Sequence, residues 1–460
     1  MSINFSAFEI GRRALNANQL GINVTSNNIA NVNTPGYARQ QVQLAESAPL
    51  SFSGYQVGTG VSVEGLQSYR DRFIESRLQT ETGISGKLTA RRDTLSAVEN
   101  TLQGSETSGL QNALNKFFGA FRDLEANPNS VPLRAITVQR GTALANSFQT
   151  TRSQLEQIRS SADGQIRATV DETNSLSQRI ATLNGQIRNI ESGGGQASVL
   201  RDQRGELLNK ISELTGARSV ENEDGTVTVT IGEGRALVIG DKANSISVQS
   251  VPPDGLSALT INNQPAIFEE GQIRGLQEAI AATTAQIGNL DDLAAEIAQR
   301  VNALHTSGTD LDGNAGVNFF DTSQPVTAKN ISINPALVAN SRLVVASPLA
   351  QPAEGGTVAG SIANLLTDTN STVGTKTGSF STIFSSMLSE VGEQVRQTDD
   401  ALQTHNAIVS QIVTQREAIS GVSLDEEAIN LLRYQKAFEA AARFIKVADE
   451  MTQTILSLAQ

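Results

Sequence analysis

Residues 8–37 read FEIGRRALNANQLGINVTSNNIANVNTPGY. In the first part of this stretch, large apolar residues recur every seven positions, at Phe8, Leu15, Ile22 and Ile29. A second row of mostly small residues runs beside them, through Ile10, Ala14, Ala17, Gly21 and Val24. The two rows predict one long helix with a heptad seam. Pro35 cannot continue this helix, and Pro35-Gly36 favours a tight turn with Gly36 at positive φ.

A heptad pattern also fills the other end of the chain. Positions spaced by four and three run from Phe384 to Ile419 and include His405, and Ser420-Gly421 interrupts them. Ser423 and Glu426 then form a capping box for a helix predicted over 424–459, on the order of 50 Å long. The seam of this last helix consists of Leu431, Tyr434, Phe438, Ala441, Ile445, Ala448 and Ile455.

Neither terminal helix can bury its apolar stripe alone. We therefore expect each to pair with the other, with another region or with another copy of the chain. Pairing of the two termini would give a long rod whose ends meet at one pole. Such pairing is typical of a subunit that assembles.

Helical patterns also dominate the interior of the chain. Helices are predicted over about 69–102, from 110 to the Asn127-Pro128 stop, over 130–192, 198–214 and 273–304. Gly193-Gly194-Gly195 follows a helix and is interpreted as a cap and linker. Residues 41–63 favour extended, hairpin-like connections, and 305–380 carry few periodic signals and are predicted to be mostly irregular.

One interior segment has a different character. Val227, Val229 and Ile231 alternate with threonines after an Asp224-Gly225 turn, and further short strands follow. The predicted fold is thus mainly α with an inserted small β domain, in an elongated multi-domain subunit. The domains expected are a terminal coiled-coil domain with an extended connection (1–63 and 395–460), a helical domain (64–216 and 271–394) and the β insert (217–270).

Composition excludes several classes of function. The net charge of −12 and the pI of about 4.9 disfavour nucleic-acid binding. The sequence lacks an apolar run of about 18 residues, so membrane insertion is not expected. The chain has no cysteine and only two histidines, which leaves few routes to nucleophilic or metal catalysis. The first residues do not resemble a cleaved signal peptide.

The remaining candidates for chemistry are weak. His305 ends a predicted helix without an H-E-x-x-H motif, and His405 lies on a seam, where a polar residue specifies register. Asp310, Asp312 and Asn314 resemble the start of a calcium loop, but Ala315 and Asp321 replace the expected Gly and Glu. A solvated turn is the default interpretation of this loop. We expect no enzyme activity, cofactor or resident metal.

Two segments carry a resemblance to a known family. Residues 14–19 and 25–37 resemble the N-terminal signature of the bacterial flagellar rod, hook and hook-associated axial proteins, and residues 420–427 and 430–438 resemble the family's C-terminal segment. Three further stretches, 37–40, 224–232 and 331–338, are similar to the hook-associated members. Residues 64–215 and 345–400 match mainly in helical character and order.

The resemblance implies a non-enzymatic, extracellular flagellar subunit that forms an adapter ring at the hook-filament junction, exported through the type III apparatus without a cleaved signal. In such proteins the terminal helices pair as an inner coiled coil. The implied partners are further copies in a ring, hook protein, a second junction protein or flagellin on the filament side, and an export chaperone at the C-terminal helix. Open alternatives are another axial protein, hook or rod, and a secreted adhesin that uses the β insert.

The resemblance also assigns candidate assembly residues. On this basis residues 27–37 form the helix-end and turn motif, with asparagine and tyrosine side chains that project to a neighbouring subunit; a capped helix end is the simpler alternative. The candidate interface residues are Phe8, Leu15, Ile22, Asn27, Asn28, Ile29, Asn31, Asn33, Thr34, Pro35, Gly36, Tyr37, Leu431, Tyr434, Phe438, Ile445 and Ile455.

Overall fold

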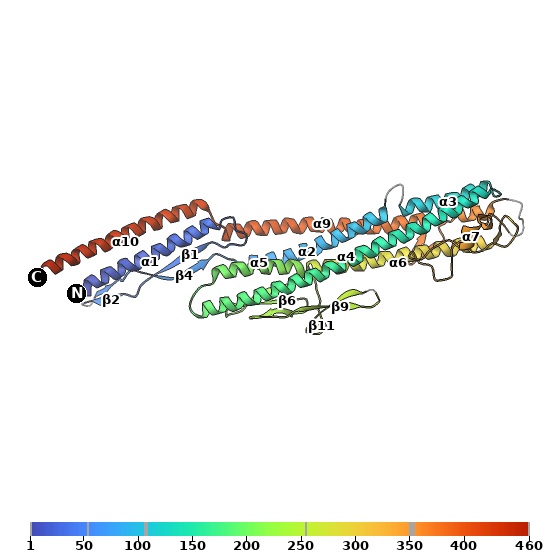
Figure 1. The fold of residues 1–460 in the computed structure, drawn as a ribbon. Coiled ribbons are helices and arrows are strands. Elements are labelled where there is room, and N and C mark those ends of the chain that lie inside the picture. Colours follow the sequence, from blue (N-terminus) through green and yellow to red (C-terminus); the bar gives the residue numbers. More distant parts are fainter. Residues whose placement is uncertain (1, 53–54, 105–108, 254, 349–354, 459–460) are drawn as a thin grey trace.

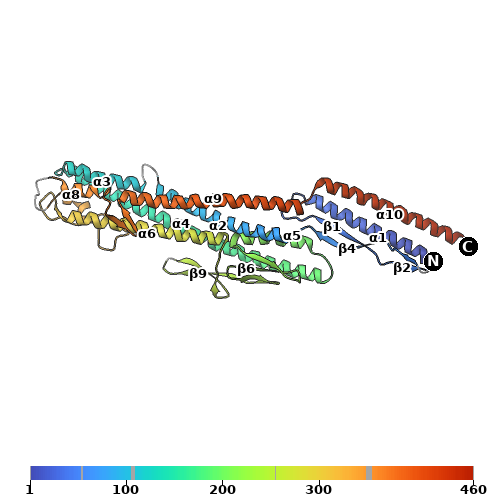
Figure 2. The ribbon, with the colours of Figure 1, turned by 180° about the vertical axis from the view of Figure 1, so that it is seen from behind.

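Long helices run lengthwise through the protein and give it the shape of a rod (Figure 1). The computed structural model describes residues 2–52, 55–104, 109–253, 255–348 and 355–458. Both termini lie at the same end of the rod, seen from opposite sides in Figures 1 and 2. The helices are α1 (Ser2–Ala30), α2 (Arg72–Gln103), α3 (Leu110–Ala126), α4 (Val131–Ser192), α5 (Ser198–Thr215), α6 (Gly271–Thr306), α7 (Pro335–Ala339), α8 (Thr357–Asn364), α9 (Phe380–Ser420) and α10 (Leu424–Leu458), with a 3-10 turn, η1 (Ser341–Leu343). This confirms the predicted fold class.

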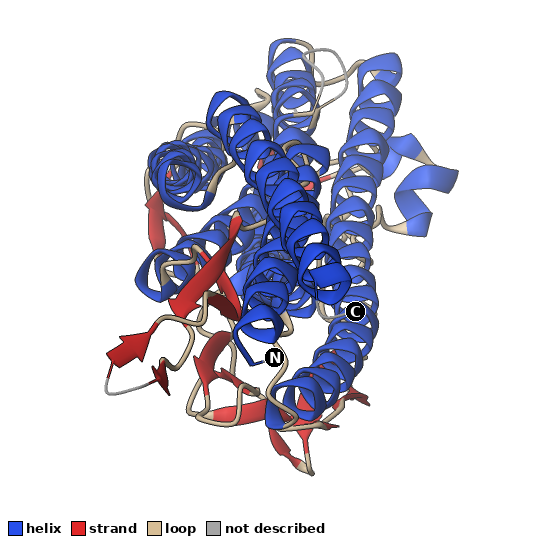
Figure 3. Ribbon diagram, turned by 90° about the vertical axis from the view of Figure 1, so that its left-hand side faces the viewer, coloured by secondary structure: helices blue, strands red, loops and turns tan. Residues whose placement is uncertain are grey.

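The strands form small antiparallel sheets beside the helices. Viewed along the rod, most strands lie at its periphery (Figure 3). The strands are β1 (Gln40–Glu46), β2 (Leu50–Phe52), β3 (Tyr55–Val57), β4 (Val61–Ser68), β5 (Arg218–Glu221), β6 (Val227–Ile231), β7 (Arg235–Ile239), β8 (Lys242–Ala243), β9 (Ile246–Val251), β10 (Leu256–Ile261), β11 (Gln264–Pro265), β12 (Gly308–Thr309), β13 (Ser347–Pro348), β14 (Ser371–Val373) and β15 (Lys376–Gly378). β1 pairs with β4 and β2 with β3, so the extended, hairpin-like connection predicted after the first helix is present.

Capping side chains explain where the long helices begin. Asp71 accepts hydrogen bonds from the backbone N–H groups of Phe73 and Ile74, at 2.8 and 3.3 Å, and starts α2. Ser130 accepts one from the Leu133 N–H at 3.4 Å and starts α4. α4 then continues for 62 residues, on the order of 90 Å, to the predicted glycine stop.

Two apolar clusters hold the rod together. The distal cluster, at the end far from the termini, joins the end of α2, α3, the first half of α4, the second half of α6, the start of α9 and residues within 319–346 and 358–373. The central cluster joins the second half of α4, α5, the first half of α6 and the β insert. α4 and α6 contribute residues to both clusters, so the distal and central parts of the rod are packed together as one body.

The β insert has four strands in the order β5-β6-β7-β8 and three in the order β11-β10-β9. On β6, Val227, Val229 and Ile231 are buried in the central cluster while the intervening threonines are half-buried. The predicted alternation therefore marks a strand whose apolar side packs on the helices.

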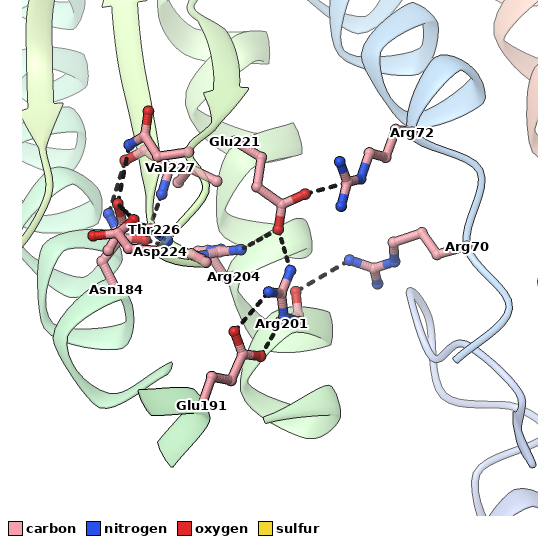
Figure 4. Close-up of polar contacts among 12 residues, drawn as sticks. Arg70, Arg72, Asn184, Glu191, Arg201, Arg204, Glu221, Asp224, Thr226 and Val227 are labelled. Atoms are coloured by element: carbon pink, nitrogen blue, oxygen red, sulfur yellow. Dashed lines mark hydrogen bonds and ion pairs between the residues drawn. The ribbon is translucent and has the colours of Figure 1, made fainter. Parts of the chain in front are cut away.

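A network of arginines and carboxylates fastens the insert to the helices (Figure 4). Arg204 of α5 donates to the Asn184 side chain of α4 and to the Gly225 carbonyl, at 2.8 and 2.7 Å. Burial lowers the pKa of Arg204 to about 10. Arg201 bridges Glu191 at the end of α4 and Glu221 of β5. These contacts fix the orientation of the insert on the rod.

The region predicted to be mostly irregular, 305–380, is short of regular structure but is densely packed. Phe319 and Phe320 are fully buried and pack against Phe117 of α3, with ring centroids 5.5 and 5.7 Å apart. A Cβ at Gly316 would lie 2.1 Å from the His305 carbonyl oxygen. Periodicity failed here because each buried residue packs from a loop or short element, where no constant repeat applies.

The expected boundary at 394/395 falls inside α9. This helix is continuous from Phe380 to Ser420 and packs lengthwise against α2, and His405 bonds Glu81 of α2 with Nδ1 and Oε2 2.7 Å apart. His405 thus lies at a helix contact, as its seam position predicts. The break at Gly421, and not residue 395, separates the terminal helix pair from the rod.

The acidic loop at 310–314 is an exposed turn at Asp312, Gly313 and Asn314, as expected, but it departs from a solvated turn at Asp310. Asp310 is buried, and its carboxylate accepts hydrogen bonds from the Asp312 and Asn314 backbone and from the Asn314 side chain. Asp312 forms an ion pair with Arg342. Burial lowers the pKa of nearby Arg134, and the Asp310 carboxylate opposes that shift. The Asp310 carboxylate is thus bonded by the loop itself, and the Asp312 carboxylate is paired with Arg342 of η1.

His305 has a structural position at the end of α6. Its Nε2 accepts from the Val345 N–H at 2.9 Å, so the proton is on Nδ1, which donates to the Val317 carbonyl at 2.5 Å. The ring is fully buried beside Phe319. Burial lowers the pKa of His305 to about 4.

This neutral histidine predicts acid sensitivity. Above about pH 6.5, the pKa of histidine in the unfolded state, neither state binds the proton. Between about pH 6.5 and 4 only the unfolded state binds it. The free energy of unfolding therefore decreases as the pH is lowered through this range, by up to about 3 kcal/mol. We expect His305→Asn to be less stable than wild type at pH 7 but to lose less stability between pH 6.5 and 4.5, measured by urea unfolding. Above pH 7 the two proteins should show the same pH dependence. Equal losses below pH 6.5 would contradict this role.

Candidate assembly interface

The terminal helices α1 and α10 pack side by side in antiparallel orientation (Figures 1 and 2). Gly11 faces Ile445, Gly21 faces Tyr434, and the Asn28 side chain bonds Glu427. A Cβ at Gly11 or Gly21 would lie 2.5 Å from Ile445 Cγ1 or 2.6 Å from the Tyr434 ring. Glycine at these positions therefore lets the two helices approach closely.

The small-residue row of α1 does not face α10 as a whole: a Cβ at Gly21 would meet Tyr434, whereas Ile10 lies against Gly60, just before β4. Ala17, Gly21 and Val24 of this row are buried, and Ile10 and Ala14 are half-buried, as are Phe8, Leu15, Ile22 and Ile29. Gly11, which belongs to neither row, is buried and faces Ile445. Leu431, Tyr434, Phe438 and Ile445 of α10 are half-buried as well. The predicted seam is thus present, but its large residues are only partly covered within one chain.

Ile455 departs from its predicted seam position. It is 52 % exposed, because the antiparallel register places it level with the first residues of α1. Other large apolar side chains of α10 are also exposed, on a face that the sequence analysis did not single out; they are Leu424, Ile429, Leu432, Phe444, Val447 and Met451. Ile429 and Leu432 are three positions apart, and Phe444, Val447 and Met451 are spaced by three and four in the sequence.

The helix-end motif turns two of its side chains inward. Asn28 is fully buried; its amide donates to the Gln40 carbonyl and to Glu427, and its oxygen accepts from the Gln40 N–H and the Tyr37 hydroxyl. Burial raises the pKa of Tyr37 to about 12, with help from Asp202 and Glu427. The expectation that these two side chains project to a neighbour differs from the structure, because the chain's own return strand satisfies them.

The rest of the motif is available at the surface. Gly36 has φ of 76°, as predicted for the turn. Asn27, Asn33, Thr34 and Pro35 are exposed, and Asn31 is half-buried while bonding Asn27. These residues remain candidates for contact with another subunit.

Charged residues that the sequence analysis missed join the terminal pair to the rod. Arg39 donates to Glu427 at 2.9 Å and to Glu426 at 2.8 Å, which ties the strand after the turn to the start of α10. Asp202 of α5 accepts from Arg70 at 2.8 Å and from the Ala38 N–H at 3.3 Å. Burial raises the pKa of Asp202 to about 6, although Arg70 opposes the shift. Arg39 and Glu427 are 388 residues apart in the chain, so no local sequence pattern could have predicted their contact.

The fold and this interface define a class: an elongated subunit whose paired terminal helices present unfilled apolar surface. Family comparisons show that the chain is similar to bacterial flagellar axial proteins over three segments. The model described as "Flagella basal body rod protein" matches residues 8–37, "Flagellar basal body rod FlgEFG protein C-terminal" matches 407–458, and "Flagellar hook-associated protein FlgK helical domain" matches 95–320.

Relatives that match along their whole length make the similarity more specific. The chain is similar to proteins named flagellar hook-associated protein 1. It is 27 % identical to that protein of Bacillus subtilis over 99 % of each chain, and 27 % identical to that of Escherichia coli over 96 % of this chain and 98 % of the relative. It shares its fold with the flagellar hook junction protein FlgK from Burkholderia pseudomallei, with a TM-score of 0.65 at 15 % identity over 75 % of this chain and all of the other.

Proposed function

We propose that this chain is a non-enzymatic structural subunit of the bacterial flagellum that forms an adapter ring at the hook-filament junction, on which the filament assembles. Its relatives of matching length carry the name hook-associated protein 1. The observation that carries the proposal is that the terminal helix pair, α1 and α10, buries few apolar side chains within one chain. Among the described side chains of these two helices, the buried apolar ones are Ala17, Val24, Ala441 and Ala448.

The large apolar side chains of the pair are half-buried or exposed. Burial of such side chains contributes about 1.5–3 kcal/mol each, so the pair gains most of its stability when neighbours cover it. Ordering of the terminal helices is therefore coupled to polymerisation. The exposed stripe on α10 also gives an export chaperone a surface to cover before assembly.

The three domains have distinct places in this proposal. The terminal helices line the tube, the helical rod surrounds them, and the β insert (217–270) projects outward. The ring contacts hook protein on one side and a second junction protein or flagellin on the other, outside the cell after type III export. Among the described residues, no helix is long and apolar enough to cross a membrane.

Deletion of the gene in its host tests the proposal. We expect complete hooks without filaments by electron microscopy and flagellin lost to the medium by immunoblot, with both defects reversed by the wild-type chain. Missing hooks would place the subunit in the rod or hook instead. Normal filaments would contradict the proposal.

A further inference from the structure

Exposed apolar side chains on one side of α10 form two groups, Ile429 with Leu432 and then Ala440, Phe444, Val447 and Met451, with Arg433 and Lys436 between them; we call these six apolar residues the outer face. Ile429 is 67 % exposed and Leu432 59 %. Exposed stripes of this length on one helix mark a contact surface. The question is which surface covers it.

A second apolar surface lies on the opposite side of α1. The β1–β4 ribbon packs on α1, so that α1 lies between α10 and the ribbon (Figures 1 and 2). Leu44 and Val63 are register partners on this ribbon and are 44 % and 39 % exposed. Leu50, Tyr55 and Val57 of the adjoining β2–β3 hairpin are exposed too.

The two surfaces lie at the same height along the rod. The contacts Gly11–Ile445 and Asn28–Glu427 place residues 427–445 of α10 level with residues 11–28 of α1. The ribbon covers the same length, because Gln40 bonds Asn28 at one end and Gly60 faces Ile10 at the other. Rotation about an axis parallel to the rod, without a rise, therefore brings the outer face of one copy to the ribbon of the next.

The charges of the two surfaces are complementary. The ribbon and its hairpin, residues 40–68, carry Glu46 and Glu64 and no lysine or arginine, and both carboxylates are exposed. The middle of α10 presents exposed Arg433, Lys436 and Arg443. Lys436 pairs with Glu439 of the same helix at 3.0 Å, so Arg433 and Arg443 are the cations that the ribbon's carboxylates would meet. Complementary charge at the rim of an apolar patch fixes register and disfavours wrong partners.

We propose that the outer face of α10 packs against the β1–β4 ribbon of the adjacent copy of this chain. The inference rests on the proposed function, in which copies surround a common axis. The contact uses two different surfaces on each copy, so it is heterologous and closes into a ring by rotation alone. Within each copy α1 lies between its own α10 and its own ribbon. The contacts with the two neighbouring copies then cover the outer side of that α10 and of that ribbon.

The absence of cysteine from the chain allows a direct test. Val63→Cys lies on the ribbon, and Ala440→Cys lies on the outer face near the same height. The double variant is expressed in the deletion strain, hook-filament complexes are isolated, and disulfides are formed by mild oxidation. We expect a ladder of dimers, trimers and larger species on a non-reducing gel, since each copy contributes both thiols.

The matched control is Val63→Cys with Ala442→Cys. Ala442 is an exposed alanine about 200° around the helix from Ala440, because a helix turns about 100° per residue. We expect its ladder to be several-fold weaker. Equal ladders from the two pairs, or dimers from Ala440→Cys alone, would overturn the proposal.

Charge reversal provides a second measurement. Glu64→Arg in the double-cysteine chain should lower the yield of the ladder several-fold, and adding Arg443→Glu should restore it. No recovery would overturn the pairing of these two surfaces. Filament growth is scored in parallel: filaments without cross-links contradict this inference alone, whereas a chain missing from isolated complexes contradicts the proposed function as well.

Discussion

Gly21→Leu is expected to abolish filament growth while the rod itself remains folded. The Cβ alone would lie 2.6 Å from the Tyr434 ring, and leucine adds three more carbons in the same direction. Overpacking of this kind costs about 1–3 kcal/mol. In a helix pair that buries mainly small residues, that cost is enough to separate α1 from α10.

The measurement is complementation of the deletion strain, with filaments counted by electron microscopy. Gly164→Leu is the matched control, because a Cβ at this exposed helical glycine meets nothing within 4 Å. It should support normal filaments. Circular dichroism melting of the purified proteins checks that the rod is intact, and normal filaments from the Gly21 variant would show that close approach of the two helices is not required.

The sequence predicted this helix pair well, for physical reasons. Heptad spacing marks both terminal segments as helices with a seam, and Pro35 and Gly421 mark where the helices stop. The pattern did not determine which positions of α1 face α10. Gly11 and Gly21 mark that face, because small residues allow close approach, whereas the row of large side chains is only half-buried.

Other parts of the fold were beyond sequence reasoning. Phe319 and Phe320 belong to the distal core, yet they lie in a segment without periodicity because loop residues reach the core one at a time. The inward orientation of Asn28 depends on Gln40 and Glu427, and no local rule links a helix end to a residue 399 positions away. The order of elements could thus be predicted, but the polar contacts between chain ends could not.

Arg39→Met is expected to loosen the joint between the terminal pair and the rod. The Glu427 side chain is only 3 % exposed and accepts from Arg39 at 2.9 Å and from Asn28 at 3.0 Å. Removing one partner of a buried ion pair costs about 3–5 kcal/mol, because the other charge stays buried without compensation. Amide exchange in peptides covering 27–40 and 420–430 should therefore accelerate by about two to three and a half orders of magnitude, measured by hydrogen-exchange mass spectrometry.

A double variant separates charge from shape at this joint. Glu427→Gln removes the stranded charge while its amide can still meet Asn28, so Arg39→Met with Glu427→Gln should exchange more slowly than Arg39→Met alone. Arg12→Met is the matched control: Arg12 pairs with Glu9 at the surface, where such pairs contribute about 0–1 kcal/mol, and its loss should leave both peptides unchanged. If the Arg39 variant behaves like the Arg12 variant, the buried pair does not hold the joint. If the double variant exchanges as fast as the single one, the loss comes from the missing arginine contacts and not from the stranded carboxylate.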